Sequence, residues 1–280
     1  MLAGLLPPLN GPDGARKRTL RGALLCAFTC SLAAPSGGCS EEAPMRVFAA
    51  ASLGPAMEDA AEAYEARTGT RVRVTAAGSQ VLRRQLEAGA PADVYAPASY
   101  AHVEGAVRGS LGEVTLLACN RPVVVTGPGS AVRGLETLDR AERLVIGTPE
   151  APIGAYTDAI FARAERRYGA AWRRRVDAKV VSRELDVRQV LTKVQLGEAD
   201  AAIVYATDAA RARSPIQARP IPEELGVVAR YPIAVTEGAA PEARAFVRWL
   251  REDGFSHLAR HGWTRCPSEE SPAEERGGGA

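Results

Sequence analysis

The chain is poor in the residues that build metal centres and redox sites. It contains five cysteines and three histidines among 280 residues, with no CxxC pair and no Cys/His cluster. The histidines, His102, His257 and His261, show no spacing typical of metal ligands. The sequence therefore gives little support for a bound metal cation, and we expect no cofactor.

The chain also lacks a charge excess of either sign. Its 35 Lys and Arg residues face 33 Asp and Glu residues, a formal net charge of +2. Nucleic-acid-binding proteins usually carry a clear basic excess or stripe, so this balance argues against that class. With 46% hydrophobic and only 5% aromatic residues, the composition is that of a globular protein.

The motifs of common enzyme classes are absent. There is no GxSxG, GxxxxGK[ST] or HExxH, and no GxGxxG after an expected strand. An exported serine hydrolase would have to use Ser52 or Ser79 with one of the three histidines. Neither a nucleophile elbow nor an oriented His–carboxylate pair is visible in the sequence, so we expect no enzymatic activity and keep the hydrolase as a distant alternative.

Residues 1–38 have the features of an export signal. A basic cluster at 16–21 precedes an apolar run at 22–34. At 13 residues this run is shorter than the roughly 20 residues that a membrane-spanning helix needs. Small residues before Cys39 resemble a bacterial lipoprotein cleavage site, although Ser36 stands where Leu is usual. The alternative is a plain secretory signal with an incidental cysteine. We expect a periplasmic protein with a lipid anchor at Cys39.

Removal of the signal changes the charge and the set of cysteines. Without residues 1–38 the chain has 31 basic and 32 acidic residues, a net charge of −1. Cys119 and Cys266 then remain besides Cys39. Two cysteines in an oxidising compartment can pair, but they lie far apart in the sequence. Two independent thiols is therefore the interpretation that we favour.

From Met45 onward, short apolar runs alternate with amphipathic segments. The clearest helices follow Ser52, with a stop at Gly69, and Asp186, with a stop at Gly197. This alternation predicts βαβ units, an α/β class and mostly parallel sheets flanked by helices. The expected strands are Arg46–Ala50, Arg71–Ala76, Asp93–Ala96, Leu116–Val125, Leu144–Gly147, Lys179–Ser182, Ala201–Tyr205 and Tyr231–Val235. We expect the tail at 267–280 to be disordered.

Several expected helices begin directly after a strand with a small hydroxyl residue or a bare backbone. Ser52 and Ser79 are two such positions, and the helices that open at Pro152 and Asp186 are two more. Helix N-termini present unpaired N–H groups and a partial positive charge, so several that converge can bind an anion without any cation. The simpler reading of each serine alone is a helix N-cap.

Six separated segments resemble signatures of the periplasmic molybdate-binding protein family. The resemblance covers about residues 45–265, in order and in register. The segments are Val47–Leu53, Ser79–Asp93, Pro152–Tyr156, Asp186–Tyr205, Tyr231–Val235 and Arg260–Trp263.

The resemblance implies a type II periplasmic-binding-protein fold with two α/β lobes and a ligand in the cleft between them. Lobe one would comprise 45–122 plus 231–266 and lobe two 123–230, after a linker at 39–44. By similarity, an oxyanion would be held by the hydroxyl groups of Ser52, Ser79 and Tyr205 and by the amides of Ser52, Ser79, Ile153 and Val187. The family further implies a monomer that delivers molybdate or tungstate to the permease of an ABC importer.

The chemistry of these residue types agrees with that assignment. A tetrahedral dianion offers only acceptors, so a site made of donors suits molybdate, tungstate or sulfate. About seven hydrogen bonds to a buried oxyanion, each contributing roughly 1.5–3 kcal/mol, can give submicromolar affinity. Sulfate is the nearest alternative ligand. A carboxylate of Asp186 or Glu184 in the cleft would change the choice of anion, but we expect Asp186 to cap its own helix.

Overall fold

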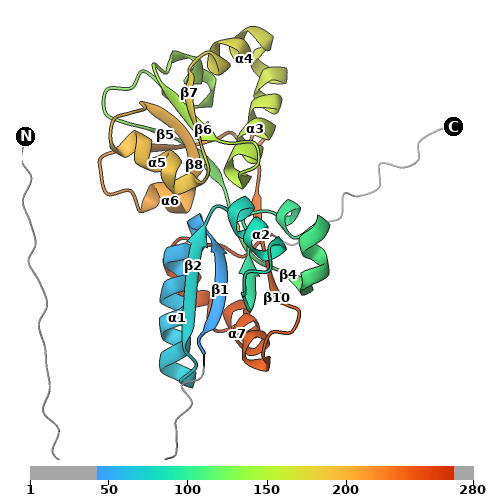
Figure 1. The fold of residues 1–280 in the computed structure, drawn as a ribbon. Helices are drawn as coiled ribbons and strands as arrows, with labels where there is room; N and C mark the ends of the chain where they lie inside the picture. The colour runs from blue at the N-terminus through green and yellow to red at the C-terminus, as the bar shows by residue number, and fades with distance from the viewer. Residues whose placement is uncertain (1–42, 268–280) are drawn as a thin grey trace, which may run out of the picture. The chain divides into compact units, whose positions relative to one another are not determined.

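The computed structural model describes residues 43–267, which belong to one compact unit. The expected export signal, the lipid-anchor residue Cys39 and the tail from residue 268 lie outside the described residues. The described chain builds two five-stranded sheets with helices packed on them, which we call lobe one and lobe two (Figure 1). The α/β class and the two-lobed architecture predicted from the sequence are confirmed.

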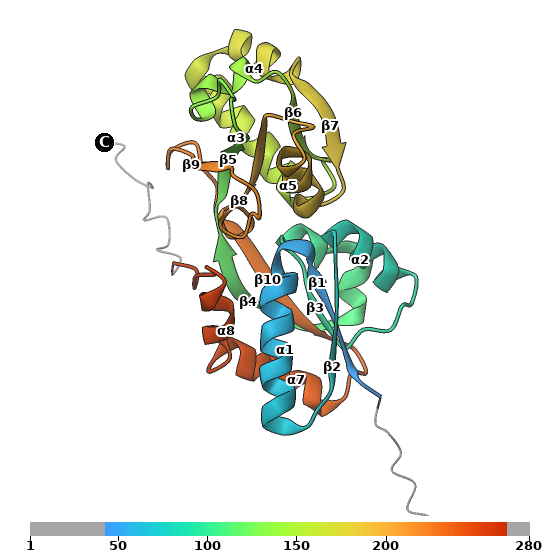
Figure 2. The same ribbon diagram turned by 90° about the vertical axis from the view of Figure 1, so that its left-hand side faces the viewer.

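Lobe one is built on the strand order β2-β1-β3-β10-β4. Its strands are β1 (Met45–Ala50), β2 (Val72–Ala77), β3 (Val94–Ala96), β4 (Leu111–Asn120) and β10 (Ala229–Thr236). Its helical elements are η1 (Ala51–Leu53), α1 (Gly54–Thr68), α2 (Ser79–Glu87), η2 (Tyr100–His102), η3 (Gly105–Ser110), α7 (Pro241–Arg251) and α8 (Phe255–Arg260). Figure 2 shows α1 alongside β1 and β2, with α7 and α8 nearby.

Alternating side chains of β1 place apolar groups on both faces of this sheet. Val47 packs into the core shared with α1 and α7, whereas Phe48 packs with Leu82 of α2 on the other face. Helix α1 ends where the sequence predicts, because Gly69 adopts a left-handed conformation (φ 76°) and its N–H reaches the carbonyl of Glu65.

Lobe two is built on the strand order β7-β6-β8-β5-β9. Its strands are β5 (Pro122–Thr126), β6 (Leu144–Gly147), β7 (Val180–Glu184), β8 (Ala201–Tyr205) and β9 (Gln217–Pro220). Its helical elements are η4 (Leu135–Arg140), α3 (Pro152–Tyr168), α4 (Ala170–Asp177), α5 (Val187–Gln195) and α6 (Ala206–Ala210). Within residues 43–267, we find no helix long and apolar enough to cross a membrane.

The sheets are mixed and not mostly parallel, which corrects one expectation. β1 pairs in parallel with β2 and β3, and β6 pairs in parallel with β7 and β8. The remaining strands pair antiparallel because the chain leaves lobe one through β4 and returns through β10, which lie side by side in opposite directions. β5 similarly runs against β8 and β9.

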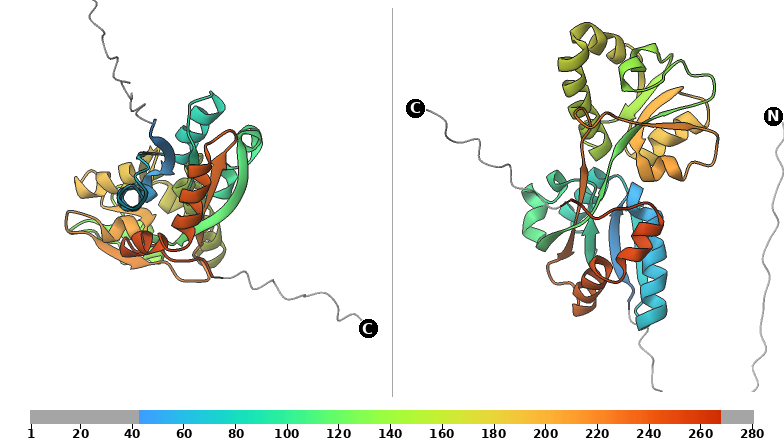
Figure 3. Two further views of the ribbon diagram at one scale, coloured as in Figure 1. Left: turned by 90° about the horizontal axis from the view of Figure 1, so that it is seen from below. Right: turned by 180° about the vertical axis from the view of Figure 1, so that it is seen from behind.

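The expected strand Leu116–Val125 is in fact two strands in different sheets. β4 ends at Asn120 in lobe one, and β5 begins at Pro122 in lobe two, so the chain crosses between the lobes at Arg121. Figure 3 shows the two lobes from behind, with the chain passing between them. The Asn120 side chain marks the break, since its Oδ1 accepts a hydrogen bond from the Arg121 N–H and its Nδ2 donates to Thr207.

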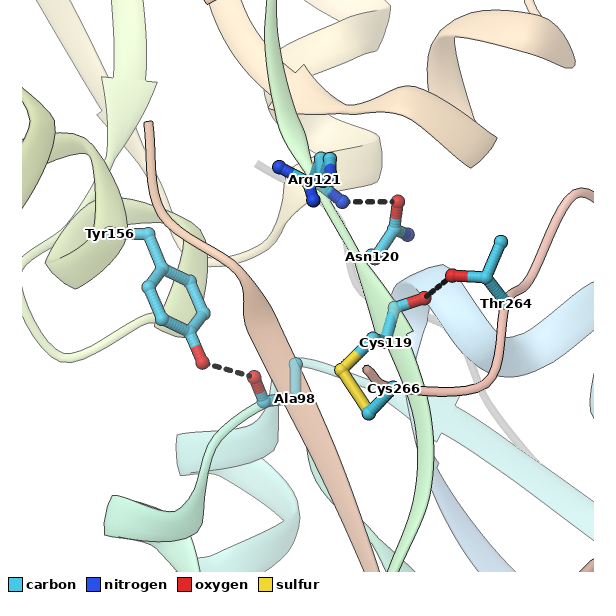
Figure 4. Close-up of a disulfide and its surroundings, with 7 residues drawn as sticks. All are labelled: Ala98, Cys119, Asn120, Arg121, Tyr156, Thr264 and Cys266. Carbon is cyan, nitrogen blue, oxygen red and sulfur yellow. Dashed lines mark hydrogen bonds between the residues drawn. A yellow bond between two sulfur atoms is a disulfide. The ribbon is translucent and has the colours of Figure 1, made fainter. Parts of the chain in front are cut away.

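Cys119 and Cys266 form a disulfide, so the expectation of two independent thiols is wrong. The pairing follows from local backbone contacts, because Cys119 forms an antiparallel bridge with Thr264. The Cys119 N–H donates to the Thr264 carbonyl over 2.9 Å, which brings the next-but-one residue, Cys266, to a Cα–Cα distance of 5.0 Å from Cys119. Figure 4 shows the disulfide and the further bond from the Thr264 hydroxyl to the Cys119 carbonyl. The disulfide connects the C-terminal segment to the end of β4, just before the crossing.

Candidate functional site

The five residues predicted to bind an oxyanion all lie where a strand passes into a helix. Ser52 follows β1 and Ser79 opens α2 after β2, both in lobe one. Ile153 is the second residue of α3, Val187 is the first residue of α5, and Tyr205 ends β8, all in lobe two. The carboxyl ends of parallel strands meet at one edge of a sheet, which is where open α/β sheets commonly bind ligands.

The structure brings these five residues together around one small cavity between the lobes. Its volume is about 20 Å³. A single water needs roughly 10–15 Å³, so the cavity has room for a small ligand only. The lining residues are Ala50, Ala51, Ser52, Gly78, Ser79, Ala98, Ala151, Pro152, Ile153, Leu185, Asp186, Val187 and Tyr205.

Both serine hydroxyl groups already have a neighbour that can donate to them. The Ala98 N–H donates to Ser79 Oγ over 3.0 Å, so the Ser79 hydroxyl proton is left to donate elsewhere. Ser52 Oγ lies 2.9 Å from the Tyr231 hydroxyl, and either group can be the donor. If Tyr231 donates, the Ser52 proton is also free. An acceptor in the cavity favours this arrangement because it needs both serines as donors.

Backbone amides add further donors because of their place in the helices. The first N–H groups of a helix have no partner within it. Ser79 and Val187 are first residues of α2 and α5, Ile153 is the second residue of α3, and Ser52 lies in the short helix η1. The helix dipoles of α2, α3 and α5 add partial positive charge at their N-termini.

The Tyr205 hydroxyl is buried in the cavity wall, and the side chain is only 1% exposed. It has no hydrogen-bond partner of normal geometry within the described part of the chain, although the Tyr231 hydroxyl is near enough to influence its pKa. Burial raises the pKa of Tyr205 well above its ordinary value. The group therefore stays protonated, and a buried donor without a partner indicates that a ligand belongs there.

The carboxylates of Asp186 and Glu184 do not offer an acceptor to the cavity. Asp186 lines it but acts as the N-cap of α5, since Oδ1 accepts from the amides of Arg188 and Gln189 and Oδ2 accepts from Gln189 Nε2. Glu184 accepts a hydrogen bond from Ser182 and is not among the residues that line this cavity. The capping pattern leaves the Val187 amide free.

The cavity thus presents neutral donors, and the Asp186 carboxylate in its lining accepts hydrogen bonds from α5. No Lys, Arg or His is among its lining residues. A fully deprotonated oxyanion would accept from every side, whereas hydrogenphosphate would need an acceptor for its own proton. The donor set therefore selects against a protonated anion.

Within residues 43–267, neither a cluster of metal ligands nor a serine–histidine pair at Ser52 or Ser79 is formed. No group of three or more Cys, His, Asp or Glu side chains there is placed to hold a metal ion. The serine hydrolase would need a histidine on Ser52 or Ser79, but their hydroxyl partners are Tyr231 and Ala98. His257 and His261 instead contact Asp59.

The sequence alone did not reveal the residues that support the site. Tyr231 belongs to the segment Tyr231–Val235, but its role depends on the contact with Ser52, which is distant in the sequence. The Ala98 amide has no sequence signal at all, because a backbone donor is independent of the side chain.

The chain is similar to known proteins in both sequence and fold. A sequence profile described as bacterial extracellular solute-binding protein matches residues 45–264. The molybdate-binding protein ModA of Mycobacterium tuberculosis is 34% identical over 230 residues, which cover 80% of this chain and 84% of that protein.

Two solved structures share the fold. The periplasmic molybdate-binding protein of Azotobacter vinelandii has a TM-score of 0.67 at 18% identity, covering 80% of this chain and 100% of that one. The sulfate-binding protein SubI of M. tuberculosis has a TM-score of 0.68 at 18% identity, covering 79% and 86%. The matched family consists of solute-binding proteins that act outside the cytoplasm and are not enzymes. This chain belongs to the bacterial extracellular solute-binding protein family and, within it, groups with the molybdate-binding proteins that its motifs resemble.

Proposed function

We propose that the protein captures molybdate or tungstate in the cavity between its lobes and delivers the anion to the permease of an ABC importer. The observation that carries the proposal is the convergence of Ser52, Ser79, Ile153, Val187 and Tyr205 on one small cavity, with the Tyr205 hydroxyl buried and unpartnered among the described residues. The name of the mycobacterial relative supports the choice of anion.

Neutral donors explain how a nearly uncharged protein would hold a dianion. The four amides and three hydroxyl groups of the proposal belong to residues that line the cavity, so binding would need little reorganisation. Charge-assisted hydrogen bonds in a buried site are stronger than those between neutral groups. Affinity would then come from aimed dipoles and not from net charge.

A thermal-shift panel tests the proposal directly. We expect molybdate and tungstate to raise the melting temperature of the mature protein more than sulfate or phosphate do, because a ligand that binds only the folded state stabilises it. A protein stabilised by phosphate alone, or by none of these anions, would be inconsistent with the proposed function.

Sulfate is the second candidate ligand, and the fold shared with a sulfate-binding protein favours its inclusion. The donors fit both anions, so selectivity would depend on the size of the cavity. Competition calorimetry separates the two cases: a molybdate affinity that sulfate reduces only at large excess supports molybdate, whereas a tighter affinity for sulfate replaces it.

We also propose that the protein works as a monomer anchored to the membrane by lipid on Cys39. The resemblance of the preceding residues to a lipoprotein cleavage site supports the anchor. Metabolic labelling with a palmitate analogue tests it, since Cys39→Ser is expected to abolish the label and to release the protein from the membrane fraction. Sedimentation of the soluble mature form tests the monomer.

A further inference from the structure

Two hydrogen bonds whose acceptors, Leu185 and Ala98, belong to the cavity lining join the lobes directly. Gln80 Nε2 of lobe one donates to the Leu185 carbonyl of lobe two over 2.5 Å. The Tyr156 hydroxyl of lobe two donates to the Ala98 carbonyl of lobe one over 3.2 Å (Figure 4). Neither Gln80 nor Tyr156 is among the residues that line the cavity.

Each of these bonds connects segments that carry the candidate anion donors. Gln80 directly follows Ser79, and Leu185 lies two residues before Val187. On the other side, Ala98 is the residue whose N–H holds Ser79 Oγ. Tyr156 lies near the start of α3, three residues after Ile153. The two bonds therefore connect the surroundings of Ser79 in lobe one to the segments of lobe two that carry Ile153 and Val187.

Both hydrogen bonds lie where the two lobes pack closely against each other, so they form only when the lobes are close. Gln80 is only 5% exposed. A Cβ atom on the neighbouring Gly78 would lie 2.7 Å from the Leu185 carbonyl oxygen, so the backbones meet closely there. The ring of Tyr156 stands edge-on to Tyr205, and burial raises the pKa of Tyr156, which keeps its hydroxyl a donor. A hydrogen bond at a buried site of low dielectric is electrostatically stronger than one exposed to water.

We infer that Gln80 and Tyr156 are positioning residues that hold the two lobes closed over the anion without touching it. The inference rests on the proposed function, because closure matters only if the cavity binds a ligand. Separation of the lobes breaks both bonds, so they stabilise the closed form alone. They are therefore expected to slow release of the anion and to leave its association rate unchanged.

Stopped-flow tryptophan fluorescence with molybdate tests this on the mature protein. The slope of the observed rate against molybdate concentration gives the association rate constant, and the intercept gives the release rate constant. We expect Gln80→Met to release molybdate about two- to tenfold faster, the range for loss of one hydrogen bond. Tyr156→Phe should accelerate release at least as much, because the Tyr156 hydroxyl also interacts with Ser99 and with the backbone of Arg230. Tyr168→Phe in the same helix and Gln85→Met in α2 are matched controls and should behave as wild type.

The ligand-free melting temperature distinguishes residues that stabilise only the closed form from residues that stabilise the whole fold. If Gln80 and Tyr156 stabilise only the closed form, their variants keep the ligand-free melting temperature and lose part of the increase that molybdate causes. Wild-type release rates in both variants overturn the inference and leave the proposed function intact. An equal fall in melting temperature with and without molybdate assigns a structural role and also overturns it. A wild-type protein that responds to no oxyanion rejects the proposed function, and the inference with it.

Discussion

At the scale of single residues, the direction of each hydroxyl proton determines what the cavity can bind. Ser79 Oγ accepts from the Ala98 N–H, and Ser52 Oγ can accept from the Tyr231 hydroxyl. When Tyr231 donates to Ser52, each serine oxygen accepts one hydrogen bond from the protein, and its own proton is available to an anion. A chain of donors of this kind is cooperative, because each bond polarises the next.

Removal of the Tyr231 hydroxyl tests this order of donors. Tyr231→Phe keeps the ring that packs on Trp263 and removes the bond to Ser52. We expect molybdate affinity to fall about two- to tenfold in titration calorimetry. Because the effect would act through Ser52, adding Tyr231→Phe to Ser52→Ala should cost little more. Fully additive losses would show that the two hydroxyl groups act independently.

At the scale of elements, the backbones of the two lobes approach each other closely at the N-terminus of α2. Gly78 has an ordinary conformation (φ −55°, ψ 134°), so an alanine there meets no backbone strain. Its Cβ would instead lie too near the Leu185 carbonyl oxygen of lobe two.

The substitution Gly78→Ala is therefore expected to hinder closure and to weaken molybdate binding at least fivefold, with little change in the ligand-free melting temperature. Gly109→Ala is a suitable control, since a Cβ there would meet no atom within 4 Å. Calorimetry that finds equal affinities for the two variants would refute the close approach as a determinant of binding.

Helix α6 carries a buried acid next to the site. Burial raises the pKa of Asp208 from 3.8 to about 7. A carboxyl whose folded pKa exceeds its unfolded pKa destabilises the protein increasingly as pH rises between those two values. Asp208→Asn should therefore gain stability relative to wild type from about pH 4 to pH 7, with a constant difference above that. Urea unfolding at several pH values measures it, and a difference that does not change with pH would contradict the assignment.

The sequence predicts the elements well where the pattern is local and poorly where the partner is distant. Asp186 as a helix cap and Gly69 as a helix stop depend on neighbouring residues and are confirmed. β9 was missed because Gln217–Pro220 is a polar and largely exposed edge strand without an apolar alternation. The contact of Gln80 with Leu185 could not be predicted, because it joins residues about one hundred positions apart.

At the scale of the whole molecule, the disulfide connects the C-terminal segment to the strand that leads into lobe two. Cys119 lies two residues before the crossing at Arg121, and its backbone also bonds Thr264. The crosslink spans a long stretch of chain, so it restricts the unfolded state strongly. It holds the last described residues of lobe one beside the crossing.

Loss of this crosslink should destabilise the protein without removing any donor from the cavity. We expect Cys119→Ala/Cys266→Ala to lower the free energy of unfolding by about 2–5 kcal/mol, and to leave molybdate affinity within about twofold at a temperature where the variant is folded. Denaturant unfolding and calorimetry measure the two quantities. A large loss of affinity in the folded variant would mean that the disulfide also controls closure.

The central claim is that neutral donors hold a fully deprotonated oxyanion between the lobes. Titration calorimetry of molybdate with wild-type protein, Ser52→Ala and Tyr205→Phe tests it most directly. We predict submicromolar binding by wild type and an affinity at least tenfold weaker in each variant, because each loses one donor to the anion. Unchanged affinity in both variants would contradict the account and remove these residues from the site.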